Sequence, residues 1–114
     1  MSLPFTDAIS VITAVASTTT SDAYDISKRQ QASIQFIAAG GASVFTIDVS
    51  NDATNWITGA AFLDAKATAT GTSVVSKSVS SSTEGAFIRT GFRYIRVVAT
   101  VTNGTATALL QTGG

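Results

Sequence analysis

The sequence predicts an all-β fold: a single antiparallel β-sandwich, jelly-roll-like in form, with an extended N-terminal arm. Apolar and polar residues alternate in short runs, most clearly in VFTIDVS at residues 44–50. A period of two is typical of a strand with one buried and one solvated face. Clusters of glycine, serine and asparagine divide the chain into about eight such runs, spaced as they are in sandwiches and barrels.

Length and composition indicate one domain. A chain of 114 residues can bury roughly two thirds of its unfolded surface around one core. We assign residues 1–7 to the arm and residues 8–112 to the sandwich. Apolar residues make up 45% of the chain and aromatic residues only 8%, which predicts a light core rich in alanine and valine.

Charge and residue usage argue against several functions. Seven basic and seven acidic residues give zero net charge, whereas nucleic-acid-binding domains normally carry a basic excess. Cysteine and histidine are both absent, which removes disulfides, thiolate metal sites and the commonest general base. No spacing marks a catalytic carboxylate pair, and Asp48, Asn51 and Asp52 lack the rest of a calcium loop. We expect no enzymatic activity, no catalytic residue, metal or cofactor, and no nucleic-acid partner.

The apolar run at residues 9–16 is predicted to be a strand. Ser10 and Thr13 interrupt it, and it is too short to span a bilayer. Asp7 precedes it where a signal peptide would carry a basic residue. We therefore expect no membrane partner, and a chain that starts at Met1 in a bacterial or viral cytoplasmic product.

Three strands are predicted before the centre of the chain. Residues 8–16 and 23–26 form the first two, and residues 32–38 form a third with clear alternation. Gly40-Gly41 then separates this strand from the run at 44–50. Because a two-residue glycine turn between alternating runs is a hairpin signal, these two strands are predicted to pair.

Residues 44–58 are predicted to form the central hairpin. The polar run NDATN at 51–55 supplies side chains that favour turns, and Trp56 opens the returning strand. The predicted sheet partner is YIRVVATV at residues 94–101, in which alternate residues from Ile95 onward form the buried face.

The second half of the chain continues in short strands. Residues 61–70 are predicted to be extended, although a short helix is the alternative. Residues 73–79 are predicted to form one exposed edge strand on which Lys77 discourages unwanted pairing. Phe87 is predicted to point inward. Asn103-Gly104 predicts a tight hairpin turn into the last strand.

Two groups of side chains are candidates for contacts. Trp56 is expected to cap the end of the core, and the alternative is that Trp56 and Tyr94 form a sugar-stacking platform on an exposed face. Three arginines close together in sequence are expected to pair with carboxylates or across subunits. They are Arg89, Arg93 and Arg96, with Asp48 and Asp52 as candidate partners.

Two segments carry a family resemblance. IDVSNDATNWIT at residues 47–58 and FRYIRVVATVTNGTATALL at residues 92–110 resemble a pattern of small bacteriophage virion proteins with a β-sandwich fold. Those proteins carry a Ser-x-Asp-Gly-x-x-Trp hairpin and a closing Tyr-x-Arg-Val strand. The matching residues are Ser50, Asn51, Asp52, Asn55 and Trp56, then Tyr94, Ile95, Arg96 and Val97. Ala53 stands in place of the usual turn glycine. Discoidin-like carbohydrate- and lipid-binding sandwiches carry a similar hairpin but are commonly longer, extracellular and stapled by cysteines.

The phage resemblance implies a capsid decoration (cement) protein or a related head or tail accessory subunit. It implies the major capsid protein and further copies of the chain as partners, as a homotrimer on the head surface of the virion, made in the bacterial cytoplasm. We expect Leu3, Pro4 and Phe5 of the arm to face the shell. The residues expected to pair across subunits are Ile9, Val11 and Ile12. The alternative is a carbohydrate-binding module of a phage fibre or tail, acting through Trp56 and Tyr94.

Overall fold

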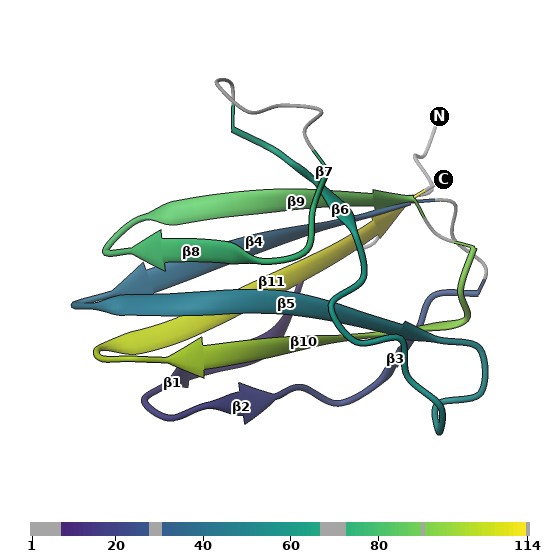
Figure 1. Ribbon diagram of the computed structural model, residues 1–114, viewed down its shortest axis with the longest axis horizontal. Coiled ribbons are helices and arrows are strands. Elements are labelled where there is room, and N and C mark those ends of the chain that lie inside the picture. Colours follow the sequence, from purple (N-terminus) through teal and green to yellow (C-terminus); the bar gives the residue numbers. More distant parts are fainter. Residues whose placement is uncertain (1–7, 28–30, 67–72, 90, 114) are drawn as a thin grey trace.

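The computed structural model describes residues 8–27, 31–66, 73–89 and 91–113. Within these ranges the chain forms two antiparallel sheets packed face to face and contains no helix, which confirms the predicted sandwich (Figure 1). Residues 1–7 lie outside the described ranges, so the division into arm and sandwich stays a prediction.

The larger sheet has six strands in the order β1-β11-β4-β9-β6-β7. These are β1 (Ile9–Val15), β11 (Thr105–Gly113), β4 (Gln31–Ala39), β9 (Thr83–Arg89), β6 (Phe62–Asp64) and β7 (Ser73–Val74). The smaller sheet has the order β2-β10-β5-β8, and β3 also pairs with β10. These are β2 (Thr19–Thr20), β10 (Tyr94–Val101), β5 (Ala42–Ser50), β8 (Lys77–Ser80) and β3 (Tyr24–Asp25).

The core lies between the two sheets and is centred on three phenylalanines. Phe36 of β4 stacks on Phe45 of β5 with ring centroids 4.6 Å apart, and Phe62 of β6 meets Phe36 edge-on at 6.0 Å. All three are buried, together with the small inward side chains Ala106 and Ala108 of β11. Burying a phenylalanine in this way stabilises the fold by about 1.5–3 kcal/mol. The light, alanine-rich core agrees with the composition.

Consecutive strands cross between the sheets where the sequence predicted hairpins. β4 pairs with β11 and β9, whereas β5 pairs with β10 and β8, so the prediction that Gly40-Gly41 joins paired strands is wrong. The Asn103-Gly104 turn likewise carries the chain from β10 in one sheet to β11 in the other. The β8–β9 connection crosses in the same way, and these three connections meet at one end of the sandwich, on the left of Figure 1.

The crossing turns pack closely against one another, and two glycines allow this close approach of the backbones. Gly104 has a φ of +72°, and a Cβ there would lie 2.3 Å from the Ala39 carbonyl oxygen. A Cβ at Gly41 would lie 2.4 Å from the Asn103 carbonyl oxygen. The Ala42 backbone N–H donates to Asn103 Oδ1 at 2.8 Å, which ties the two turns together. The glycines are therefore required by backbone packing between turns, and not by hairpin geometry.

The predicted pairing between the central strand and residues 94–101 is confirmed. The predicted returning strand of the central hairpin is much shorter than expected. β5 pairs with β10 over eight residues, from Ser50↔Tyr94 to Ser43↔Val101. After the turn, the chain makes only one bridge to β5, between Val49 and Ile57. β8 occupies the other half of that edge of β5, which leaves no room for a longer return.

Two further predictions about the second half are wrong. The predicted edge strand at residues 73–79 is split into β7 and β8, which belong to different sheets. Phe87 points outward and is 50% exposed, because Ala86 and Ile88 take the inward positions of β9. The extended prediction for residues 61–70 is confirmed at β6, and residues 67–70 lie outside the described ranges.

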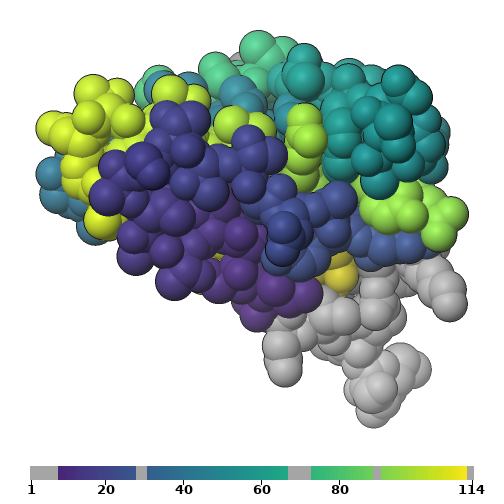
Figure 2. Space-filling view, turned by 90° about the horizontal axis from the view of Figure 1, so that it is seen from below, coloured from purple at the N-terminus to yellow at the C-terminus, as the bar shows by residue number. Residues whose placement is uncertain are grey.

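The N-terminal segment closes one side of the sandwich. β1 pairs with β11 of the larger sheet and β2 with β10 of the smaller, so the chain crosses from one sheet to the other along this side. Figure 2 shows this purple segment lying over the lower side of the molecule. The pairing of β1 is irregular, with register shifts on both sides of Ile12. A bulged edge strand is a poor template for unwanted strand pairing.

Candidate interaction surfaces

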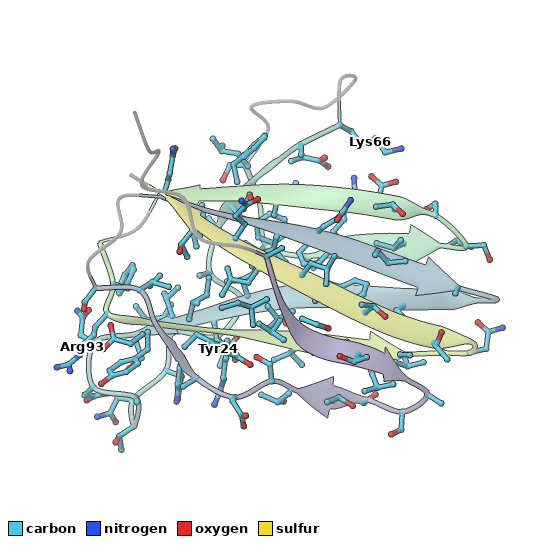
Figure 3. All side chains as sticks on the ribbon, turned by 180° about the vertical axis from the view of Figure 1, so that it is seen from behind. Tyr24, Lys66 and Arg93 are labelled. Atoms are coloured by element: carbon cyan, nitrogen blue, oxygen red, sulfur yellow. The ribbon has the colours of Figure 1, made fainter. Side chains whose placement is uncertain are left out.

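The first candidate surface is an arginine–aromatic patch on the outer face of the smaller sheet, at the end opposite the crossing turns. Its members are Asp25 of β3, Asp48 of β5, Trp56, Arg93, and Tyr94 and Arg96 of β10. Tyr24 of β3 lies opposite the buried Ile95 and packs against the core, so it borders the patch from the inner side. Figure 3 shows Tyr24 and Arg93 together at this end, with Lys66 far away beyond the other sheet. The patch thus gathers residues from four separate segments.

Arg96 is the centre of the patch. It lies opposite Asp48 in the β5–β10 register, and its Nε donates to Asp48 Oδ2 at 2.9 Å. The Gly59 backbone N–H donates to the other carboxylate oxygen at 3.1 Å. The Arg96 guanidinium then lies over the Trp56 ring, 4.2 Å from its centroid. Because Asp48 is almost fully buried, this stack is held from below by a fixed carboxylate.

A second, more exposed stack lies beside the first. The Arg93 guanidinium is 5.1 Å from the Tyr94 ring centroid, and its Nε donates to Asp25 Oδ2 at 3.4 Å. The pKa of Asp25 is lowered, first by hydrogen bonds from Ser27 and then by Arg93. Of the predicted arginine–carboxylate pairings, Arg96–Asp48 is confirmed, and Arg93 takes Asp25 in place of Asp52.

The turn after β5 is fixed by its own side chains. Asp52 Oδ1 accepts hydrogen bonds from the Thr54 and Asn55 backbone N–H groups at 2.9 and 2.8 Å, and Oδ2 accepts one from the Asn55 side chain at 2.8 Å. These bonds, with the Asn55 side chain first, hold the pKa of Asp52 far below its ordinary value. The buried Ser50 hydroxyl donates to Asp52 Oδ1 at 2.9 Å. Ala53, in place of the usual glycine, has a φ of +58°.

A cluster of charges lies between the sheets and was missed by sequence reasoning. Lys77 of β8 points inward and forms an ion pair with Asp64 of β6, and its Nζ lies 3.6 Å from Glu84 Oε1 on β9. Lys66 Nζ pairs with the other Glu84 oxygen at 3.2 Å. The hydrogen bond from Lys77 lowers the pKa of Asp64, and Asp64 in turn raises the pKa of Lys77. The prediction that Lys77 guards an exposed edge is therefore wrong; Lys77 links the two sheets.

The second candidate surface is a groove of about 430 Å³ on the outer face of the larger sheet, here called the outer groove. The pairing register places its floor in two rows. One row contains Leu109, Gln35 and Gly85, and the other contains Gln111, Ser33 and Phe87. Ala8 lines one side and Ala65 and Lys66 line the other. Gly85 helps keep the floor low, because a Cβ there would lie 3.2 Å from the Ala65 side chain.

The charged residues that line the outer groove are Lys66 and Glu84, which pair with each other at 3.2 Å. The outward residues of β4, β9 and β11 that form the floor carry amide, hydroxyl and apolar side chains, apart from Gly85. Phe87 is 50% exposed, and Leu63, its partner on β6, is 39% exposed. Adjacent exposed apolar side chains within a concave face are typical of a contact surface.

The predicted contact residues lie in different environments. Ile12 is buried in the core of its own chain, and Val11 packs partly buried against it. Ile9 is 45% exposed beside the outer groove's Ala8. Leu3, Pro4 and Phe5 lie outside the described residues. A role in contacts between subunits stays a prediction for all of these residues.

The possible glycan residues are brought near each other, although not as an open platform. Trp56 and Tyr94 are both partly exposed, and each faces an arginine guanidinium. Trp56 lies outside the buried cluster, so it does not cap the core. Among the described residues no group of three or more potential metal ligands occurs, and the absence of catalysis stays a prediction.

Comparisons with known proteins relate the chain by fold. No protein-family model and no curated protein matches the sequence. The SPBc2 prophage-derived protein YomS has the same fold, with a TM-score of 0.78 and 8% identity, over 96% of this chain and 93% of YomS. Two further likenesses are more distant. One is to a chain of the Bacillus endospore appendages, which form disulfide-linked pili (TM-score 0.44, 17% identity, 98% of this chain and 88% of that one). The other is to CBM32-3 of a Clostridium perfringens family 31 glycoside hydrolase (TM-score 0.40, 19% identity, 90% and 72%).

The shared fold with YomS shows that this chain is a β-sandwich of a kind found in a prophage-derived protein. Within the described residues, no helix has the length and apolar character needed to cross a membrane.

Proposed function

We propose that the chain is a structural protein of a bacteriophage virion, namely a capsid decoration (cement) protein that binds the outer surface of the head. The single observation that supports this most is the fold shared with a prophage-derived protein over nearly the whole of both chains. The motif resemblance at residues 47–58 and 92–110 independently leads to the same class of protein.

The physical character of the molecule suits this role. A cement subunit accelerates no reaction; it needs a stiff core and surfaces that fit neighbouring proteins. The Lys77–Asp64 pair joins the two sheets, and the crossing turns lock one end of the sandwich. Modest contacts repeated over many copies add through multivalency, so each contact surface can be small. The major capsid protein is the proposed partner, and the chain itself is proposed to act as a homotrimer.

The test is binding to heads that lack the chain. Purified chain is mixed with such heads, sedimented, and quantified in the pellet. The proposal predicts saturable binding at a fixed ratio to the capsid subunit and a higher temperature of head disruption. Folded chain that stays in the supernatant would rule out the cement role.

Carbohydrate binding is the alternative, supported by the partly exposed rings of Trp56 and Tyr94 next to two arginines. A stacked guanidinium covers part of each ring, which leaves less aromatic face for a sugar. A glycan array with the wild type and Trp56→Ala distinguishes the two functions. Binding that is lost in the variant supports a receptor-binding module, and an array without signals supports the structural role.

A further inference from the structure

We infer that the outer groove is the docking site for the N-terminal arm, residues 1–7, of a second copy of this chain. The inference deepens the proposed function by naming what joins the copies. It rests on that function in one respect, which is that copies of the chain assemble with one another. For Leu3, Pro4 and Phe5, this placement replaces the expectation that they face the shell, and it does not depend on capsid binding.

The arm begins beside the outer groove. Ala8 is the first described residue, and it lines the outer groove. Seven residues precede it, with the sequence MSLPFTD. An extended chain of this length reaches about 23 Å. Crossing from β1 to β9 takes three strand spacings, or about 14 Å, so an arm can cover the floor of a groove of this width.

The side chains of the arm fit the chemistry of the outer groove. Leu3, Pro4 and Phe5 form an apolar centre in the arm. In the outer groove, Phe87 and Leu109 provide apolar surface, and Gln35 and Ser33 provide amide and hydroxyl groups that can bond an extended backbone. Proline lacks an N–H and is extended, so it fits a peptide laid across a sheet face. The volume of about 430 Å³ lies within the usual range for binding pockets, about 300–1,000 Å³.

The direction of β1 favours the arm of a second copy as the occupant of the groove. β1 runs antiparallel to β11, with Ile9 opposite Leu110, so the chain at Ala8 points along β11 toward its C-terminal end. Entering its own groove would require a sharp turn across the strands immediately before Ala8. Residues 1–7 contain no glycine, and Pro4 favours an extended chain at Leu3 and at itself. Because the chain at Ala8 points along β11 and not across the sheet, we place residues 1–7 in the groove of a second copy.

The experiment measures mass by light scattering and sedimentation on the full chain. Phe5→Ser weakens the arm, and Phe87→Glu places a charge in the outer groove. Ile57→Glu is the matched control, because Ile57 is 53% exposed but lies outside the groove. The full chain and the control are expected to form the same oligomer. The arm and groove variants are each expected to raise the dissociation constant by at least about tenfold, the effect of losing part of one buried phenylalanine.

A mixture of the two defective variants is the most stringent part of the experiment. Phe5→Ser retains an intact groove and Phe87→Glu retains an intact arm, so together they are expected to form a dimer that neither forms alone. Far-ultraviolet circular dichroism and urea midpoints check that all variants are folded. A monomeric wild type, an oligomer that survives both substitutions, or a mixture without dimers would overturn the inference. A monomer that still binds heads would leave the cement role standing, and an oligomer that does not bind them would overturn that role alone.

Discussion

Replacing Lys77 by methionine should be among the most damaging single changes in the protein. The side chains of Asp64 and Glu84 are 2% and 12% exposed, and Lys77 lies against both. Methionine keeps the length of the side chain and removes the charge, so two carboxylates are left between the sheets with one cation fewer. Removing one partner of a buried pair typically costs about 3–5 kcal/mol, a large share of a total stability of about 5–15 kcal/mol.

The pH dependence gives this prediction a second readout. In the wild type the pKa of Asp64 is lowered, first by the hydrogen bond from Lys77, so its contribution is present above the unfolded pKa near 3.8 and is lost as the pH falls through the folded pKa. In Lys77→Met that cause is gone, and burial favours the protonated acid. The stability gap between wild type and variant is therefore expected to be widest at neutral pH and to narrow as the pH falls.

Urea unfolding, followed by circular dichroism at pH 7 and pH 4, measures both effects. Adding Asp64→Asn to Lys77→Met is expected to restore about 1–3 kcal/mol at pH 7, because the stranded charge is removed. Arg93→Met is the control: it breaks a pair whose side chains are 56% and 46% exposed, and it should change stability little. A loss below about 1 kcal/mol at pH 7, or a gap that does not depend on pH, would refute the reasoning.

Three further changes test other parts of the fold. Gly104→Ala should cost more than about 2 kcal/mol, because its Cβ would lie 2.3 Å from a carbonyl oxygen at a positive φ, whereas Gly91→Ala meets no atom within 4 Å and should be nearly neutral; urea midpoints decide. Ala53→Gly should leave stability unchanged or raise it by up to about 1 kcal/mol, because the φ of +58° is strained for alanine, and a clear loss would show that this strain is not relieved. Asp52→Asn should destabilise the turn at pH 7, and the difference should disappear well below pH 3.8, because the pKa of Asp52 is lowered in the folded state; an equal loss at both ends of the pH range would contradict this.

Sequence reasoning predicted single strands well and their arrangement less well. The predicted strand at 94–101 has the bounds of β10, and its partner at the centre of the chain is β5, in full register. Alternation determines both, because a strand buried on one face must repeat every second residue. Alternation does not say to which sheet a strand belongs. Gly40-Gly41 and Asn103-Gly104 therefore predicted turns correctly and pairing wrongly.

The candidate surfaces were predicted in part, for a related reason. Arg96–Asp48 was among the expected pairs, and its stacking on Trp56 depends on the path of the chain after the turn, which local pattern does not specify. Lys77 was predicted to discourage pairing on an exposed edge strand, but two carboxylates on other strands make an inward position favourable. Phe87 was predicted to point inward, yet Ala86 and Ile88 take the inward positions of β9. A signal for this outward register existed in Gly85, which shares a face with Phe87 and helps form the outer groove.

Quantitative mass spectrometry of purified phage particles, made from the genome that encodes this chain, tests the central claim most directly. A structural virion protein is expected in the particles at a fixed stoichiometry to the major capsid protein, and it should be missing from particles of a deletion strain. Abundant chain in infected cells together with its absence from purified particles would contradict the account.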